Sequence, residues 1–179
     1  KRLNKPGKPL AVIFVGDELA TIGFVSQKER TCEELGLDFK KIQLDSGVSE
    51  SDLIDKIREI SRDVGGIIIQ LPLPIGIDQE RVLNAIPKEL DVDLLSDVSK
   101  QEPLVLAPSV GVVEEIVRRY DLDLESLMVS VVGIGKLVGG PISTWLNNRC
   151  KRLLLLDKGD DLSKTKEADI VISGVGIPG

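Results

Sequence analysis

The sequence predicts an α/β fold made of two consecutive units, each built on a parallel β-sheet. Short apolar runs of the kind found in strands covered on both faces alternate with stretches of helical period. The alternation stops once, over residues 91–108, and then resumes. Since parallel strands need crossover connections, alternating strands and helices favour a parallel sheet in each half.

The first half contains three expected strands separated by helices. In chain order we expect a strand over 10–16, a helix over 18–35, a strand over 39–44, a helix over 49–63, a strand over 65–70 and a helix over 78–86. Gly36 is placed to end the first helix, because glycine tolerates the left-handed conformation found at helix C-termini. Ser49 is placed to cap the second helix, because its hydroxyl can accept a backbone N–H.

The acidic and proline-containing stretch at 91–108 marks the expected domain junction. We therefore expect one domain over residues 1–107 and a second over residues 108–179, with a helix over 110–120 linking them. The second half is expected to contain a strand over 127–133, a helix over 139–148 and strands over 152–157 and 168–176.

Composition excludes several classes of function. The chain has 179 residues, 42% of them hydrophobic, a net charge of −6 and no histidine. The negative charge disfavours nucleic acid and anionic membranes as partners, and the missing imidazole removes His-based catalysis and His-metal sites. Cys32 and Cys150 form no C-x-x-C pattern, so we expect no metal site, no disulfide framework and a cytosolic location.

The stretch "VSVVGIGKLVGGPI" has the strand, glycine-rich turn and helix that a dinucleotide site requires. Gly133 would permit the turn, Gly135 would let a pyrophosphate approach the backbone, and Gly139 would let the helix pack closely. The N-terminus of that helix would offer unpaired N–H groups to a phosphate. The alternative is an ordinary α/β turn that needs glycine for its geometry.

Asp157 ends the next expected strand, 24 residues after Gly133. An acid near this position typically accepts hydrogen bonds from an adenosine ribose and repels a 2′-phosphate, which favours NAD over NADP. Lys158 beside it would partly offset the repulsion. The alternative is that Asp157 caps or turns the chain.

One face of the first helix combines Thr21, Phe24, Lys28 and Cys32 at helical spacing. We expect this stripe to face the sheet, and a lysine among small and apolar neighbours is unusual there. A partly buried lysine of this kind is suited to proton transfer. The alternative is a lysine at the edge of the face whose ammonium reaches solvent.

The segment "GGIIIQLPLP" ends a buried strand with a polar amide. Functional groups collect at the carboxyl ends of parallel strands, so we expect the Gln70 carbonyl to meet Lys28, with the prolines stiffening the loop that follows. Asp91 and Asp93 alternate with Val92, so both carboxylates could point to one side and bind an aminopyrimidine edge. The alternatives are a strand that meets a rigid loop, and solvated loop acids.

The chain resembles the methylenetetrahydrofolate dehydrogenase/cyclohydrolase family. The resemblance rests on "VGDELATIGFVSQK", "GGIIIQLPLP", "AIPKELDVD", "VVGIGKLVGGP" and "ADIVISGVGIPG", in family order over essentially the whole chain. It implies a catalytic domain and a Rossmann-like domain with a cleft between them. It also implies oxidation of methylenetetrahydrofolate by hydride transfer to NAD or NADP, hydrolysis of the methenyl product in many members, and a homodimer.

The resemblance also assigns roles to residues. Lys28 matches the family's catalytic lysine, Gln70 the glutamine that hydrogen-bonds and tunes it, and Asp93 the carboxylate that holds the pterin. The remaining positions implied for substrate are Thr21, Phe24, Leu71 and Pro72, and those implied for cofactor are Gly133, Gly135, Lys136, Gly139, Asp157, Val175 and Gly176.

Several positions depart from the family pattern. Phe24 stands where the family usually has Tyr, which leaves the hydrolysis step open while hydride transfer is less affected. Leu94 replaces a glycine, and Ile134-Gly135 replace an Arg-Ser pair, which favours NAD. Family segments before the first strand and after the last are missing, so we expect a fragment or trimmed chain without full activity.

Two other functions stay open. The first is a binding protein that keeps the fold but has lost the chemistry through Phe24 and the missing segments. The second is a two-domain dehydrogenase of the shikimate type, which also places a lysine opposite a Rossmann domain but leaves "QLPLP" and "DVD" unexplained.

Overall fold

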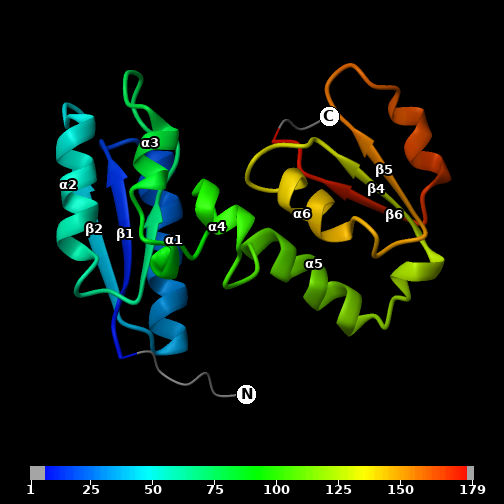
Figure 1. The fold of residues 1–179 in the computed structure, drawn as a ribbon, viewed down its shortest axis with the longest axis horizontal. Coiled ribbons are helices and arrows are strands. Elements are labelled where there is room, and N and C mark those ends of the chain that lie inside the picture. The colour runs from blue at the N-terminus through cyan, green and yellow to red at the C-terminus, as the bar shows by residue number, and fades with distance from the viewer. Residues whose placement is uncertain (1–6, 177–179) are drawn as a thin grey trace. The chain divides into compact units, whose positions relative to one another are not determined.

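The computed structural model describes residues 7–176 and divides into two compact units, residues 1–105 and residues 106–179. The last three residues of the "GVGIPG" pattern, 177–179, lie outside the described residues. Each unit is a parallel sheet with helices packed on it (Figure 1). The predicted α/β class is therefore confirmed. Among the described residues, no helix is both long and apolar enough to cross a bilayer.

The N-terminal unit contains β1 (Leu10–Val15), α1 (Leu19–Leu35), β2 (Phe39–Leu44), α2 (Glu50–Ile60), β3 (Gly66–Ile69), α3 (Gln79–Asn84), the 3-10 turn η1 (Lys88–Leu90) and α4 (Asp97–Gln101). Its strands lie in the order β2-β1-β3, all parallel. Leu10 pairs with both Phe39 and Gly66, which places β1 at the centre. The helices between the strands supply the crossovers that this order needs.

The ends of the helices follow from the predicted capping residues. Ser49 caps α2, its hydroxyl accepting the N–H of Asp52 at 3.1 Å. Gly36 ends α1 in the left-handed conformation, with φ 69°, and its N–H donates to carbonyls of the last turn. Such caps satisfy backbone groups that a helix terminus leaves unpaired, each contributing on the order of 1 kcal/mol.

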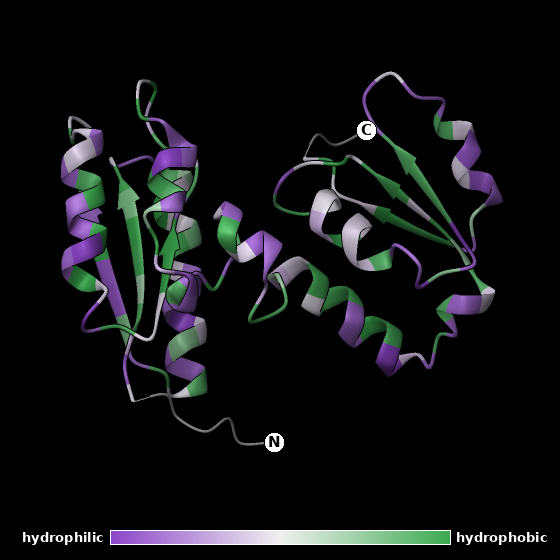
Figure 2. Ribbon diagram, viewed as in Figure 1, coloured by the Kyte–Doolittle hydropathy of each residue, from purple (hydrophilic) through white to green (hydrophobic). Residues whose placement is uncertain are grey.

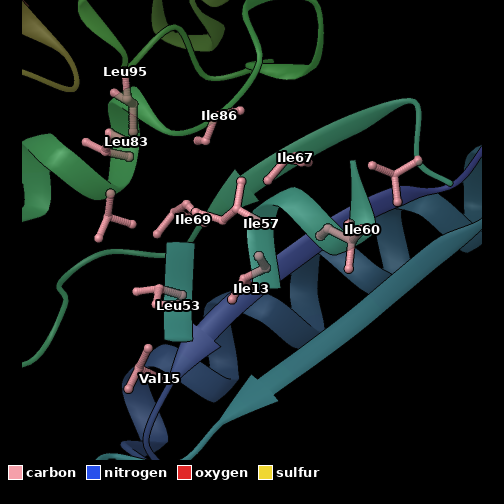
Figure 3. Close-up of a cluster of buried hydrophobic side chains, with 13 residues drawn as sticks. Ile13, Val15, Leu53, Ile57, Ile60, Ile67, Ile69, Leu83, Ile86 and Leu95 are labelled. Atoms are coloured by element: carbon pink, nitrogen blue, oxygen red, sulfur yellow. The ribbon is translucent and has the colours of Figure 1, made fainter. Parts of the chain in front are cut away.

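The side chains of the N-terminal sheet alternate between two apolar layers. On one face, Ile13 and Val15 of β1 meet Leu53 and Ile57 of α2 (Figure 3). On the other face, strand residues pack against Val25 of α1. Helices therefore cover both faces, which explains why β1 and β3 are apolar throughout, whereas the edge strand β2 carries the exposed Lys40 and Lys41 (Figure 2).

The C-terminal unit also contains a three-stranded parallel sheet, but Leu155 and Val171 of its strands are exposed, at 46% and 52%. It contains α5 (Pro108–Arg119), the 3-10 turn η2 (Leu124–Ser126), β4 (Met128–Val132), α6 (Gly139–Leu146), β5 (Arg152–Leu156), the 3-10 helix η3 (Leu162–Glu167) and β6 (Ile170–Ser173). The strand order is β5-β4-β6, all parallel, with β4 at the centre. The most buried apolar side chains of β4 and α6 are Val129, Val131, Ile142 and Leu146.

Candidate active site and glycine turn

Gln70 follows β3 and faces α1 because of the alternation along the strand. Ile67 and Ile69 belong to the layer under α2, whereas Ile68 packs with α1. Gln70 continues the series begun by Ile68, and its Oε1 accepts a hydrogen bond from Lys28 Nζ at 2.8 Å. The contact expected between these two side chains is present.

Both ends of the Gln70 amide are held. Its Nε2 donates to the carbonyl oxygen of Leu71 at 3.0 Å, and its backbone N–H donates to the carbonyl oxygen of Ile13 at 2.8 Å. Because Lys28 can only donate, the amide oxygen must face the lysine, and the bond to Leu71 fixes that orientation. The Leu71-Pro72 peptide bond is cis, Leu71 packs on the core under α2, and Pro72 is exposed.

The face of α1 that carries Lys28 differs in one position from the expected stripe. Thr21, Val25 and Cys32 are buried there, and Lys28 is half-buried among them. Phe24 instead lies outside this face, 60% exposed. The prediction that Phe24 packs toward the sheet is wrong, since Val25 at the next position occupies the core. Phe24 thus presents an aromatic surface to solvent, while Thr21 is buried.

Asp91 and Asp93 are not equivalent, contrary to the expectation that both point to one side. Asp91 is 3% exposed, and its carboxylate accepts the N–H groups of Leu95 at 3.3 Å and Ser96 at 2.9 Å. It is therefore an internal part of the loop and unavailable to a ligand. The alternative of a solvated loop acid is wrong for this residue.

Asp93 is half-buried and electrostatically linked to the lysine. Burial raises the pKa of its carboxyl, the positive charge of Lys28 lowers it, and the negative charge of Asp91 raises it further. The net direction is upward, because desolvation disfavours the charged form. Lys28, Gln70 and Asp93 thus bring a cation, a fixed amide and a carboxylate close to one another, a set able to transfer a proton and to accept N–H groups.

Leu94, next to Asp93, has a φ of 54°. The left-handed region costs a residue with a side chain roughly 1–2 kcal/mol, and glycine is the residue that usually occupies it. The loop therefore keeps a glycine-like backbone even though its residue is leucine.

The glycine turn of the C-terminal unit is closely packed. Gly133 has φ 81°, as a turn after the central strand requires. A Cβ at Gly139 would lie 1.9 Å from the carbonyl oxygen of Gly133, so no side chain fits there. A Cβ at Gly174, after β6, would lie 2.8 Å from the same oxygen. These glycines allow the start of α6 to pack directly against the ends of β4 and β6.

The start of α6 offers fewer N–H groups than predicted. The N–H of Gly140 donates to the carbonyl oxygen of Gly135 at 2.9 Å, and Pro141 has no N–H. The unpaired N–H groups expected at the N-terminus of this helix are therefore not supplied by Gly140 or Pro141. Gly135 itself is exposed, and a Cβ there would meet no atom within 4 Å. The turn is thus open at Gly135, and the residues present fit a pyrophosphate that approaches its backbone.

The remaining positions proposed for cofactor lie around this turn or after β5. Val175 packs against the turn, since a Cβ at Gly133 would lie 2.9 Å from its Cγ2. Lys136 and Gly176 are both exposed. Asp157 follows β5 and is exposed; its Oδ1 accepts the N–H of Lys158 at 2.8 Å. The turn role considered for Asp157 is therefore present, and the carboxylate also stays accessible to solvent.

Sequence reasoning did not single out a cavity of about 660 Å³ beside Trp145. The guanidinium of Arg149 lies 5.3 Å from the centre of the Trp145 ring. The cavity is lined by parts of α5, η2 and α6 and by none of the predicted site residues. A lone tryptophan shortly before an Asn-Asn-Arg stretch was the available signal.

The fold and the two sites define a two-domain α/β protein with a lysine–amide pair in its first domain and a glycine-rich dinucleotide turn in its second. Two family models match it. The model for the catalytic domain of tetrahydrofolate dehydrogenase/cyclohydrolase matches residues 1–93, and the model for the NAD(P)-binding domain matches residues 107–179. The chain belongs to the tetrahydrofolate dehydrogenase/cyclohydrolase family, which confirms the resemblance.

Individual relatives agree with this assignment. The bifunctional protein FolD of Mycoplasmopsis synoviae (strain 53) is 31% identical over 185 residues, covering 98% of this chain and 66% of that protein. The crystal structure of the bifunctional enzyme FolD, methylenetetrahydrofolate dehydrogenase/cyclohydrolase, from Campylobacter jejuni has a TM-score of 0.89 at 31% identity, covering 94% of this chain and 64% of that chain. The chain thus spans slightly less than two thirds of these relatives.

Shikimate dehydrogenases share the fold alone. The enzyme from Thermus thermophilus has a TM-score of 0.55 at 16% identity, over 93% of this chain and 68% of that chain. The distance in sequence sets the shikimate alternative aside, because both family models of the folate enzymes match, and "QLPLP" and "DVD" lie within the residues matched by the first model.

Proposed function

We propose that this protein oxidises methylenetetrahydrofolate to methenyltetrahydrofolate, with transfer of a hydride to NAD or NADP. The related structure from Campylobacter jejuni is named a methylenetetrahydrofolate dehydrogenase/cyclohydrolase. The observation that carries the proposal is the 2.8 Å hydrogen bond from Lys28 Nζ to Gln70 Oε1, next to a half-buried Asp93. This arrangement joins a proton-transfer group to a carboxylate that can bind the aminopyrimidine ring of a folate.

Each residue has a distinct task in this proposal. Asp93 accepts N–H groups of the pterin, the exposed ring of Phe24 supplies an apolar surface for its flat face, and Lys28 lies beside the reacting carbon bridge. Gln70 orients Lys28 through its fixed amide. The nicotinamide supplies the hydride acceptor when it is bound. Lys28 donates a hydrogen bond that holds the folate in place as the bridge loses a hydride.

Hydrolysis of the methenyl product to formyltetrahydrofolate is the second candidate activity, favoured by the same Lys28–Gln70 pair. Water adds to the methenyl carbon and loses one proton to solvent. The bond from this carbon to one nitrogen then breaks as the formyl C=O forms, and Lys28 is placed to pass the second proton of the water to the released nitrogen. Phe24 lacks the hydroxyl that the family usually has at this position. If the hydroxyl assists proton movement, its loss removes part of the ~10²–10⁴-fold contributed by general acid–base groups.

The proposal includes a preference for NAD. It is supported by the exposed Asp157 carboxylate and by Ile134-Gly135 in place of an Arg-Ser pair. Asp157→Ser should raise NADP use relative to NAD, and Asp45→Ser, a change in the other unit, should not. An unchanged NAD/NADP ratio in Asp157→Ser would contradict the assignment. A homodimer and a cytosolic location belong to the same proposal.

The test is a purified-protein assay with methylenetetrahydrofolate and each nicotinamide, following reduced cofactor and methenyl product by absorbance. Lys28→Met should abolish product decay and lower turnover, whereas Lys40→Met, at an exposed position of β2, should behave as wild type. Folate binding without turnover in the wild type would instead support a binding protein that has lost the chemistry.

A further inference from the structure

Asp91 has no role in the proposed reaction, although its carboxylate is almost completely buried, at 3% exposure. Removing a carboxylate from water costs several kcal/mol unless strong hydrogen bonds replace the hydration. Its two bonds to the backbone N–H groups of Leu95 and Ser96 supply that replacement. A carboxylate held in this way fixes the backbone that surrounds it.

The backbone on the N-terminal side of this contact is attached to the sheet. Asp91 forms a parallel bridge with Ile67 of β3. Val92 packs so closely on Gly66 that a Cβ at Gly66 would lie 2.7 Å from its Cγ1. The segment that leads to Asp93 therefore has a fixed register against β3.

The C-terminal side of the loop is attached to α4. Ser96 caps this helix, its hydroxyl accepting the N–H of Ser99 at 3.2 Å and donating to the Ser99 hydroxyl at 2.8 Å. Because Asp91 also holds the N–H of Ser96, its side chain ties the edge of the sheet to the start of α4. Asp93 lies between these two attachments.

We infer that Asp91 is a positioning residue for Asp93, closing the loop that presents Asp93 to the aminopyrimidine ring of a folate and placing a second negative charge beside it. The inference rests on the function proposed above. Among residues 7–176, the charged groups that act on Asp93 are Lys28 from α1 and Asp91 from its own segment, and Gln70 after β3 is uncharged. Removing the charge of Asp91 leaves burial alone to oppose the effect of Lys28 on the pKa of Asp93.

The test compares Asp91→Asn with Asp97→Asn by carbon-detected NMR titration of Asp93 and by calorimetric binding of tetrahydrofolate. Asp97 lies in α4, beyond the loop that Asp91 closes at Ser96, and accepts a hydrogen bond from Asn84 Nδ2 at 2.9 Å, so it provides the matched control. In Asp91→Asn the pKa of Asp93 should fall, folate should bind about tenfold more weakly, and KM should rise with little change in kcat. In Asp97→Asn these quantities should stay at wild-type values.

A double mutant separates positioning from general damage. If Asp91 acts through Asp93, Asp91→Asn adds little to the folate-binding loss caused by Asp93→Asn alone. An unchanged pKa of Asp93 together with fully additive losses would overturn the inference. Asp91→Ser, which keeps a hydroxyl acceptor, repeats the test if Asp91→Asn does not fold. Wild-type protein that binds no tetrahydrofolate rejects the proposed function, while the Asp93 titration still decides the effect of Asp91.

Discussion

Gly135 and Gly139 lie four residues apart in the same turn, and the structure predicts opposite consequences for replacing them by alanine. A Cβ at Gly135 meets no atom within 4 Å, whereas a Cβ at Gly139 would lie 1.9 Å from a backbone carbonyl oxygen. Gly135→Ala should therefore affect the ligand and spare the fold, and Gly139→Ala should affect the fold.

The magnitudes follow from these contacts. At a position that alanine can adopt without strain, Gly→Ala stabilises by roughly 0.4–1 kcal/mol through the unfolded chain. Gly135→Ala should thus leave the melting temperature unchanged or a few degrees higher. Gly139→Ala forces the backbone to move by about 1 Å, and overpacking of this kind lowers the free energy of unfolding by about 3 kcal/mol. In a domain of this size, that loss lowers the melting temperature by roughly 12 °C or more.

The assay pairs thermal unfolding with calorimetric titration of NAD and NADP. If the pyrophosphate approaches the backbone at Gly135, its alanine variant should bind the nucleotide at least about tenfold more weakly, equivalent to about 1.4 kcal/mol, while remaining as stable as the wild type. Full nucleotide affinity in Gly135→Ala would refute the placement of the phosphates, and a stable Gly139→Ala would refute the packing argument.

Three further predictions concern buried polar groups. The Ser130 hydroxyl is buried without a hydrogen-bond partner among the described residues, so Ser130→Ala should raise the free energy of unfolding by about 1 kcal/mol in denaturant titrations; a loss would show an overlooked partner. Burial raises the pKa of Asp93, so its ionised form destabilises the native state above that pKa. Asp93→Asn should raise the melting temperature at neutral pH, and the gain should vanish below pH about 3.9; a gain that is independent of pH would contradict this sign. Gln70→Leu removes the acceptor of Lys28 and should slow hydrolysis about tenfold or more. Equal hydrolysis rates in the variant and the wild type would show that Gln70 does not orient Lys28 for this step.

The contact between Lys28 and Gln70 was predictable because strand periodicity decides it. Alternation along β3 places Gln70 on the face of Ile68, and α1 covers that face. The apolar and polar pattern of the sequence contains this information directly. The same kind of pattern predicted the alternation of strands and helices in each unit, but not α4 within the expected junction. The capping residues Ser49 and Gly36 were predicted from the chemistry of serine and glycine instead.

Other features depend on contacts that periodicity does not encode. Phe24 and Val25 are adjacent and both apolar, and packing against the sheet decides which one is buried. Asp91 and Asp93 share an alternating pattern, but the loop turns back after Asp93. The backbone N–H groups of the following residues then donate hydrogen bonds to the Asp91 carboxylate. The N–H of Gly140 is occupied because it donates to the carbonyl oxygen of Gly135, five residues earlier, a detail of local geometry.

The two units share one connectivity, with the first strand in the middle and the next two on either side of it. The first strand of each ends in a glycine of almost the same φ, 82° at Gly16 and 81° at Gly133. In such sheets, the chain leaves neighbouring strands in opposite directions at the topological switch point and opens a crevice there. Gln70 lies at the switch point of the first sheet, and the turn at Gly133 lies at that of the second. Strand order thus selects the location where a small molecule can enter each sheet, and the loop sequences determine which molecule it is.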